Sequence, residues 1–130
     1  MKSIFLVLTA GVLLAANCGK KQSTEEFLED YGRKMCYKAV ECAQEKMKEV
    51  PEEQRAMMES MIPTRGKCDK AQEEYKKKQA SEEGKKIELS SSEMELGKKC
   101  LASMEQSACD EMQSTPEECV EFNKVMAGKH

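Results

Sequence analysis

The stretch STEEFLEDYGRKMCYKAVEC, residues 23–42, indicates the fold class of this protein. Ser23, followed three residues later by Glu26, is a capping box, which predicts that a helix begins here. Apolar side chains then recur at steps of three and four residues, the spacing of one helix face. We therefore predict a helix that begins at residue 24 and ends before Pro51. Its apolar face contains Leu28, Tyr31, Met35, Ala39 and Cys42.

Two prolines organise the segment that follows. Pro51 suits the first turn of a second helix, PEEQRAMMESMI, because an amide hydrogen is not needed there. Pro63 then interrupts the pattern, so we predict a second helix in two pieces with a kink between them. The first piece carries an apolar face formed by Met57, Met58, Met61 and Ile62.

The second half of the chain has a similar plan after a loop. Residues 80–92, ASEEGKKIELSSS, have few apolar side chains and are typical of a connection. Ser90 and Glu93 form a second capping box, and Thr115 with Pro116 predicts the start of a last helix. Since no alternating β-branched run occurs, we predict an all-α domain of two helical hairpins with about four helices.

Six of the seven cysteines are predicted to be structural. Successive members of the six are separated by 5, 25, 31, 8 and 9 residues. A thiolate metal site needs closer pairs or nearby histidines, and the one histidine is His130. An even number of cysteines in a small exported domain instead favours three disulfides, so we expect no metal and no cofactor. The six are Cys36, Cys42, Cys68, Cys100, Cys109 and Cys119.

Helix geometry narrows the pairing of these six cysteines. Cys36 and Cys42 lie about 9 Å apart along one predicted helix, which is too far for a disulfide. Partners in an antiparallel hairpin lie about equally far from the turn, which pairs Cys36 with Cys68 across Pro51. The same rule pairs Cys109 with Cys119 in the second hairpin. Cys42 and Cys100 are then the two cysteines that remain. The predicted bonds are Cys36–Cys68, Cys109–Cys119 and Cys42–Cys100.

The first residues of the chain predict export. Lys2 precedes an uncharged apolar stretch, IFLVLTAGVLLAA, which has the length of a signal-peptide core and is short for a membrane span. The stretch also lacks the polar stripe of a buried helix. We therefore assign residues 1–17 as a signal peptide, residues 18–23 as a tether, and residues 24–130 as a single helical, disulfide-rich domain.

The end of this signal resembles the lipobox of bacterial lipoproteins. Asn17 departs from the Gly, Ala or Ser that usually precedes the cysteine, as in the relaxed lipobox of spirochaetes, and the chain resembles the small cysteine-containing lipoproteins of Leptospira. The resemblance implies that Cys18 carries acyl chains such as palmitate and anchors the protein in the outer membrane. Several chains at about 0.8 kcal/mol per methylene would hold it firmly. The matching residues are Leu14, Ala15, Ala16, Asn17 and Cys18.

Composition restricts the function of the mature domain. Loss of residues 1–17 removes Lys2 and leaves 20 basic and 24 acidic side chains, a net charge of about −4 that argues against binding nucleic acid. Leu, Ile, Val and Phe make up only twelve of its 113 residues, too few for hydrophobic burial alone to order the chain. We expect the nine methionines and the disulfides to supply the remaining stability.

Seven lysines around the central loop form a candidate binding surface for an anionic partner. Glutamates interleave with these lysines, so a solvated helix face is the alternative interpretation. The seven are Lys76, Lys77, Lys78, Lys85, Lys86, Lys98 and Lys99.

The methionines are a second candidate. Met57, Met58 and Met61 could contact a partner helix or a soft metal, but methionine at helical spacing more commonly fills a core, and we predict that role here. Metal buffering by methionine and cysteine is a further alternative that we do not expect.

The sequence contains no pattern of catalytic residues. No G-x-S-x-G, P-loop or C-x-x-C-H motif occurs, so we predict that the protein is not an enzyme. The expected function is that of a lipid-anchored binding module of the outer membrane, held to the membrane through Cys18 and contacting a protein or anionic partner. The alternative is a structural or accessory envelope lipoprotein that faces the periplasm.

Overall fold

The computed structural model describes residues 21–81 and 86–129, and all regular secondary structure within these residues is helical. The prediction of a small all-α, disulfide-stapled domain is confirmed. The predicted signal peptide, Cys18, Lys85 and His130 lie outside the described residues. The elements are α1 (Thr24–Met47), α2 (Glu52–Glu59), α3 (Arg65–Ser81), α4 (Ser91–Gln106), the 3₁₀ helix η1 (Glu111–Gln113) and α5 (Glu117–Ala127).

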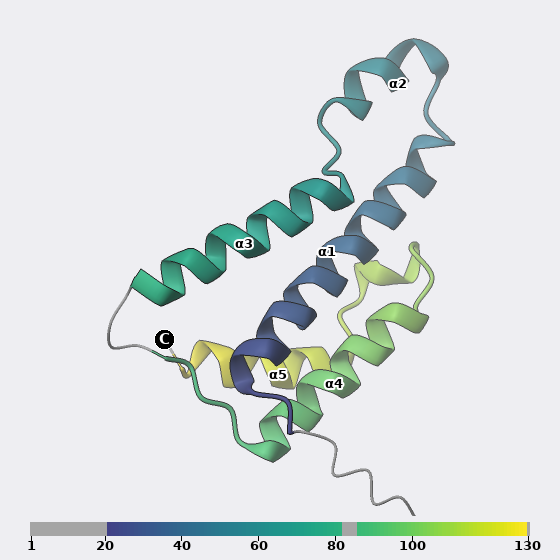
Figure 1. The fold of residues 1–130 in the computed structure, drawn as a ribbon. Coiled ribbons are helices and arrows are strands. Elements are labelled where there is room, and N and C mark those ends of the chain that lie inside the picture. The colour runs from purple at the N-terminus through teal and green to yellow at the C-terminus, as the bar shows by residue number, and fades with distance from the viewer. Residues whose placement is uncertain (1–20, 82–85, 130) are drawn as a thin grey trace, which may run out of the picture.

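Helix α1 is the central element of the fold. It begins at the predicted capping box, in which the Glu26 amide donates to Ser23 Oγ at 3.1 Å and the Ser23 amide donates to Glu26 Oε2 at 3.2 Å. Helix α1 packs against both α3 and α4, and α4 packs against α5. Figure 1 shows the resulting hairpins, α1 with α3 and α4 with α5, as the sequence predicted.

The two prolines separate helices more completely than predicted. Residues 51–63 do not form the first piece of one kinked helix, because α2 ends at Glu59 and α3 begins six residues later at Arg65. Helix α2 contacts α1 and lies at the C-terminal end of α1, away from α4 and α5 (Figure 1). Since α1 has 24 residues, α2 lies about 36 Å from the start of that helix.

The main core lies where α1, α4 and α5 meet. Phe122 is almost completely buried and makes edge-to-face contacts with Phe27 and Tyr31, at ring-centroid distances of 6.1 and 5.1 Å. Gly97 allows this approach, because a Cβ there would lie 2.5 Å from Phe27 and 2.9 Å from Phe122. The buried cluster consists of Phe27, Leu89, Cys100, Met104, Cys119 and Phe122.

The contact between α1 and α3 is mostly polar and is closed by a disulfide. Cys36 and Cys68 are bonded, as predicted. One residue further along each helix, the Tyr37 hydroxyl donates to Asp69, and this hydrogen bond raises the pKa of the tyrosine. Arg33 Nε lies 3.5 Å from Asp69 Oδ1. This hairpin therefore depends on its cross-link more than on apolar burial.

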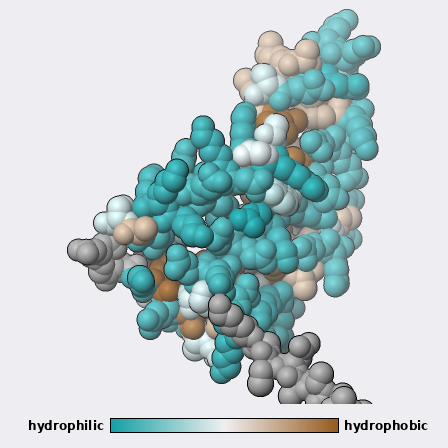
Figure 2. Space-filling model, in the orientation of Figure 1, coloured by the Kyte–Doolittle hydropathy of each residue, from teal (hydrophilic) through white to brown (hydrophobic). Residues whose placement is uncertain are grey.

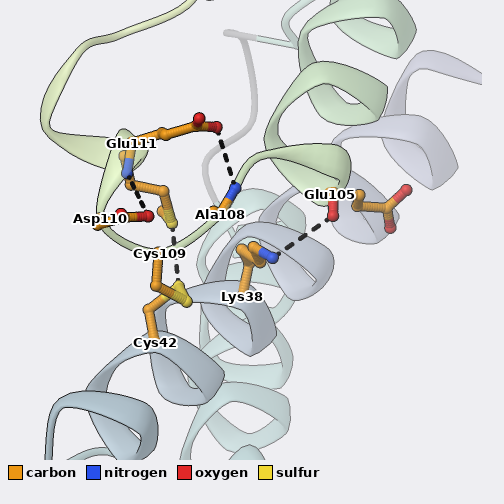
Figure 3. Close-up of a disulfide and its surroundings, with 8 residues drawn as sticks. Lys38, Cys42, Glu105, Ala108, Cys109, Asp110 and Glu111 are labelled. Carbon is orange, nitrogen blue, oxygen red and sulfur yellow. Dashed lines mark hydrogen bonds between the residues drawn. A yellow bond between two sulfur atoms is a disulfide. The ribbon is translucent and has the colours of Figure 1, made fainter.

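The other two predicted disulfides are wrong. Cys109 is bonded to Cys42, and Cys100 is bonded to Cys119. The hairpin rule assumed that Cys109 lies on the same helix as Cys100, but α4 ends at Gln106. Cys109 consequently lies in the connection between α4 and α5, which passes beside α1 (Figure 3).

The disulfide between Cys42 and Cys109 joins this connection to α1, and Figure 3 also shows one hydrogen bond from α1 to the end of α4 and others within the connection. Lys38 Nζ donates to the Glu105 carbonyl at 3.4 Å, and the Ala108 amide donates to Glu111 Oε2 at the same distance. Met112 Sδ lies 3.2 Å from Cys42 Sγ, a packing contact because a disulfide sulfur carries no hydrogen.

The start of α5 also differs from the prediction. Thr115 was expected to cap the helix with Pro116 as its first residue, but the helix begins at Glu117, and Pro116 occupies the cap position without a side-chain hydrogen bond. The predicted capping box of α4 is confirmed, since the Glu93 amide donates to Ser90 Oγ at 3.2 Å and Glu93 Oε2 accepts from the Ser90 amide at 2.7 Å.

Candidate functional site

The methionines of α2 and of the turn that follows it are exposed, and the prediction that they fill a core is wrong. The exposed fractions are 71% for Met57, 42% for Met58 and 76% for Met61. Helix α2 is short, packs on α1, and has no third layer of structure over its other side within the described residues. Figure 2 shows pale brown, apolar surface at the end of the molecule where α2 lies. We call these three residues the methionine surface.

The predicted lysine surface is only partly assembled. Lys76 and Lys86 come together on the rim of one pocket, whereas Lys98 and Lys99 lie on α4, which packs on α1 and α5. Lys76 Nζ is 3.3 Å from Glu29 Oε2, so its charge is partly compensated. Lys77 and Lys78 are exposed near the end of α3, as a solvated helix face would be.

A pocket of about 670 Å³ lies where α1 begins and α3 ends. Its walls come from the first turns of α1, the last turns of α3, and the segment that leads into α4. Brown, apolar surface is visible near this end of α3 in Figure 2. Its apolar lining consists of Leu28, Tyr75, Ala80, Ile87 and Leu89, and we call this the base pocket.

Polar contacts between the walls stabilise the base pocket. The Leu89 amide donates to Thr24 Oγ1 at 3.1 Å, and that hydroxyl donates in turn to the Leu89 carbonyl at 3.5 Å. The Gln79 amide group donates to the Tyr75 hydroxyl at 2.9 Å within α3. Lys76 joins α3 to Glu29 of α1. The side chains that could orient a polar ligand are therefore largely occupied within the protein.

The rim of the base pocket carries charges of both signs. Glu25 and Glu88 are exposed beside the exposed Lys86. Such a rim does not favour one sign of charge on a bound molecule, in contrast to the basic surface that the lysine pattern predicted.

Sequence reasoning missed the base pocket because its walls come from distant parts of the chain. Leu28 belonged to the predicted face of the first helix, but Ile87 and Leu89 lie in the segment predicted as a connecting loop. The one signal was the alternation of these two apolar residues with Lys86 and Glu88. Alternation shows that one side of a segment is buried, but it does not show which helix covers it.

The described residues offer no evident reaction centre. The base pocket is lined by neither histidine nor cysteine, and its three hydroxyls take part in the α1 cap, the Leu89 contact and the hydrogen bond from Gln79. Within residues 21–81 and 86–129, no cluster of three or more His, Cys, Asp and Glu side chains has the arrangement of a metal site. No helix in that part of the chain is both long and apolar enough to span a bilayer.

Comparison with known proteins gives no assignment. No family model, curated protein or solved structure matches this chain.

Proposed function

We propose that this protein is a lipid-anchored, non-catalytic binding module of the bacterial outer membrane. The observation that carries the proposal is the exposure of the methionine surface, Met57, Met58 and Met61. Methionine side chains are flexible and polarisable, and proteins use them where one surface must adapt to a partner. Exposed apolar patches on soluble domains commonly mark contact sites for other proteins.

The position of this surface fits an anchored module. The lipobox cysteine, Cys18, precedes the start of α1 by six residues. Helix α1 then carries α2 about 36 Å along its axis, which would place the methionine surface at the end of the domain farthest from the anchor. A protein partner would reach that end without competition from the bilayer.

Replacing Cys18 with serine tests the anchor. Serine has no thiol to form the thioether, so we expect the variant to lose palmitate labelling and to move from the detergent phase of a phase separation to the aqueous phase. Replacement of Asn17 with glycine, which restores the usual lipobox, is the control and should leave labelling intact. If Cys18→Ser protein still labels with palmitate, the lipobox assignment is wrong.

Protease treatment of intact cells then distinguishes the two orientations. Loss of the domain without lysis would support display at the cell surface. Full protection until the outer membrane is opened would favour the alternative, an accessory lipoprotein facing the periplasm.

Polar substitution of the methionine surface tests the binding function. The variant with Met57→Ser and Met61→Ser should lose at least tenfold in capture of its envelope partner from detergent extracts, because two exposed apolar contacts are removed. Val120→Ser, an exposed apolar position on α5, is the matched control. Equal capture by the wild type and both variants would show that the methionine surface is not the contact.

A further inference from the structure

We propose that the base pocket binds a single acyl chain. This inference goes beyond the proposed function. The pocket lining supports it independently of that function, and only the nearby source of the chain rests on the proposed lipid on Cys18. Its volume of about 670 Å³ lies within the range of small-molecule sites. A pocket of this size can recognise either the apolar body or the polar groups of a ligand.

The lining selects an aliphatic body over a polar group. Leu28, Ile87 and Leu89 contribute branched aliphatic side chains, and Ala80 leaves space on the α3 side. The polar groups of the walls are paired with one another, through Thr24 with Leu89, Lys76 with Glu29 and Gln79 with Tyr75. A ligand that needs directed hydrogen bonds would have to break these pairs, whereas a hydrocarbon chain needs none of them.

The charged residues at the rim do not select one kind of head group on the ligand. Lys86 can approach an anionic head group, while Glu25 and Glu88 can approach a cationic one. Binding strength should therefore follow the length of the apolar chain more closely than the charge at its end.

The pocket also lies at the end of the domain where the proposed anchor would supply acyl chains. Ser23 and Thr24 line it, and Ser23 is five residues after Cys18. Five residues span at most about 18 Å, so an acyl group on Cys18 would remain within reach of the pocket. The same chemistry could come from a free single-chain amphiphile, and the experiment distinguishes these two sources.

The test uses the unlipidated mature chain beginning at Gly19. This part carries the buried cluster and all three disulfides, so it contains a complete core of its own. The probe is a long-chain fatty acid with a photoreactive group. We expect saturable binding of one probe per chain, with cross-links on the peptides that carry Leu28, Ala80 or Ile87. Within a series of fatty acids, affinity should rise up to about fourfold for each added methylene until the pocket is filled.

A matched pair of substitutions on α3 makes the test specific. Ala80→Trp fills the pocket from an exposed position and should weaken probe binding at least tenfold. Ala71→Trp is the same change at another exposed position of α3, outside the pocket, and should leave binding unchanged. Absence of saturable binding, or equal binding by the two variants, would overturn the proposal.

The two sources of the chain are separated by repeating the cross-linking with the lipidated protein. Cross-linking that is lost in the lipidated protein and restored by Cys18→Ser means that the pocket holds the chain on Cys18. Equal cross-linking in both proteins means that it takes a free amphiphile. If Cys18 carries no lipid, the proposed anchor fails while the result with the unlipidated chain stands.

Discussion

Replacing Phe122 with alanine is expected to destabilise the domain by about 3–5 kcal/mol, the usual cost of removing a buried aromatic side chain. Phe122 is only 1% exposed and touches the rings of both Phe27 and Tyr31. Domains of this size are commonly stable by only about 5–15 kcal/mol, so the loss should be a large fraction of the total.

Urea unfolding followed by circular dichroism measures this effect. Val120→Ala on the same helix is the control, because Val120 is 40% exposed and its truncation should change stability by about 0.5 kcal/mol or less. The three disulfides must be intact in every sample, since their loss would be confounded with the loss of packing. Equal urea midpoints of unfolding for Phe122→Ala and Val120→Ala would contradict the assignment of Phe122 to the centre of the core.

Removing the disulfide between Cys42 and Cys109 is expected to cost about 4 kcal/mol. The bond joins residues 67 positions apart, the longest separation of the three, and therefore restricts the unfolded chain most. The double variant with Cys42→Ala and Cys109→Ala measures this cost without leaving a thiol behind. Removing Cys36 and Cys68 in the same way, at a separation of 32, should cost less by about 0.6 kcal/mol.

A single substitution distinguishes the observed pairing from the one predicted from the sequence. In Cys109→Ser, the observed pairing leaves a free thiol at Cys42, whereas the predicted pairing would leave it at Cys119. Alkylation in denaturant without reductant, followed by peptide mapping, identifies the free thiol. Cys68→Ser should expose Cys36 under either pairing, which verifies the method. Alkylation at Cys119 in the Cys109→Ser variant would refute the observed arrangement.

The sequence by itself determined the features that depend on neighbouring residues. The capping boxes at Ser23 and Ser90 begin α1 and α4 as predicted, because a cap is closed by hydrogen bonds within three residues. Pro51 and Pro63 separate the helices of the first hairpin, since a proline restricts its own backbone wherever it stands. The pairing of Cys36 with Cys68 was also predictable, because both lie on helices that flank one connection.

Only the tertiary structure decided the features that depend on where one element lies against another. The bond of Cys109 to Cys42 follows from the end of α4 at Gln106, after which the chain passes beside α1. The methionine surface is exposed because no third layer covers α2 in the described residues, although the same spacing would suit a core. The base pocket likewise needs Leu28 and Ile87 to meet from positions 59 residues apart. Periodicity specifies which side of a helix is apolar, but the packing partner of that side is set by long-range contacts.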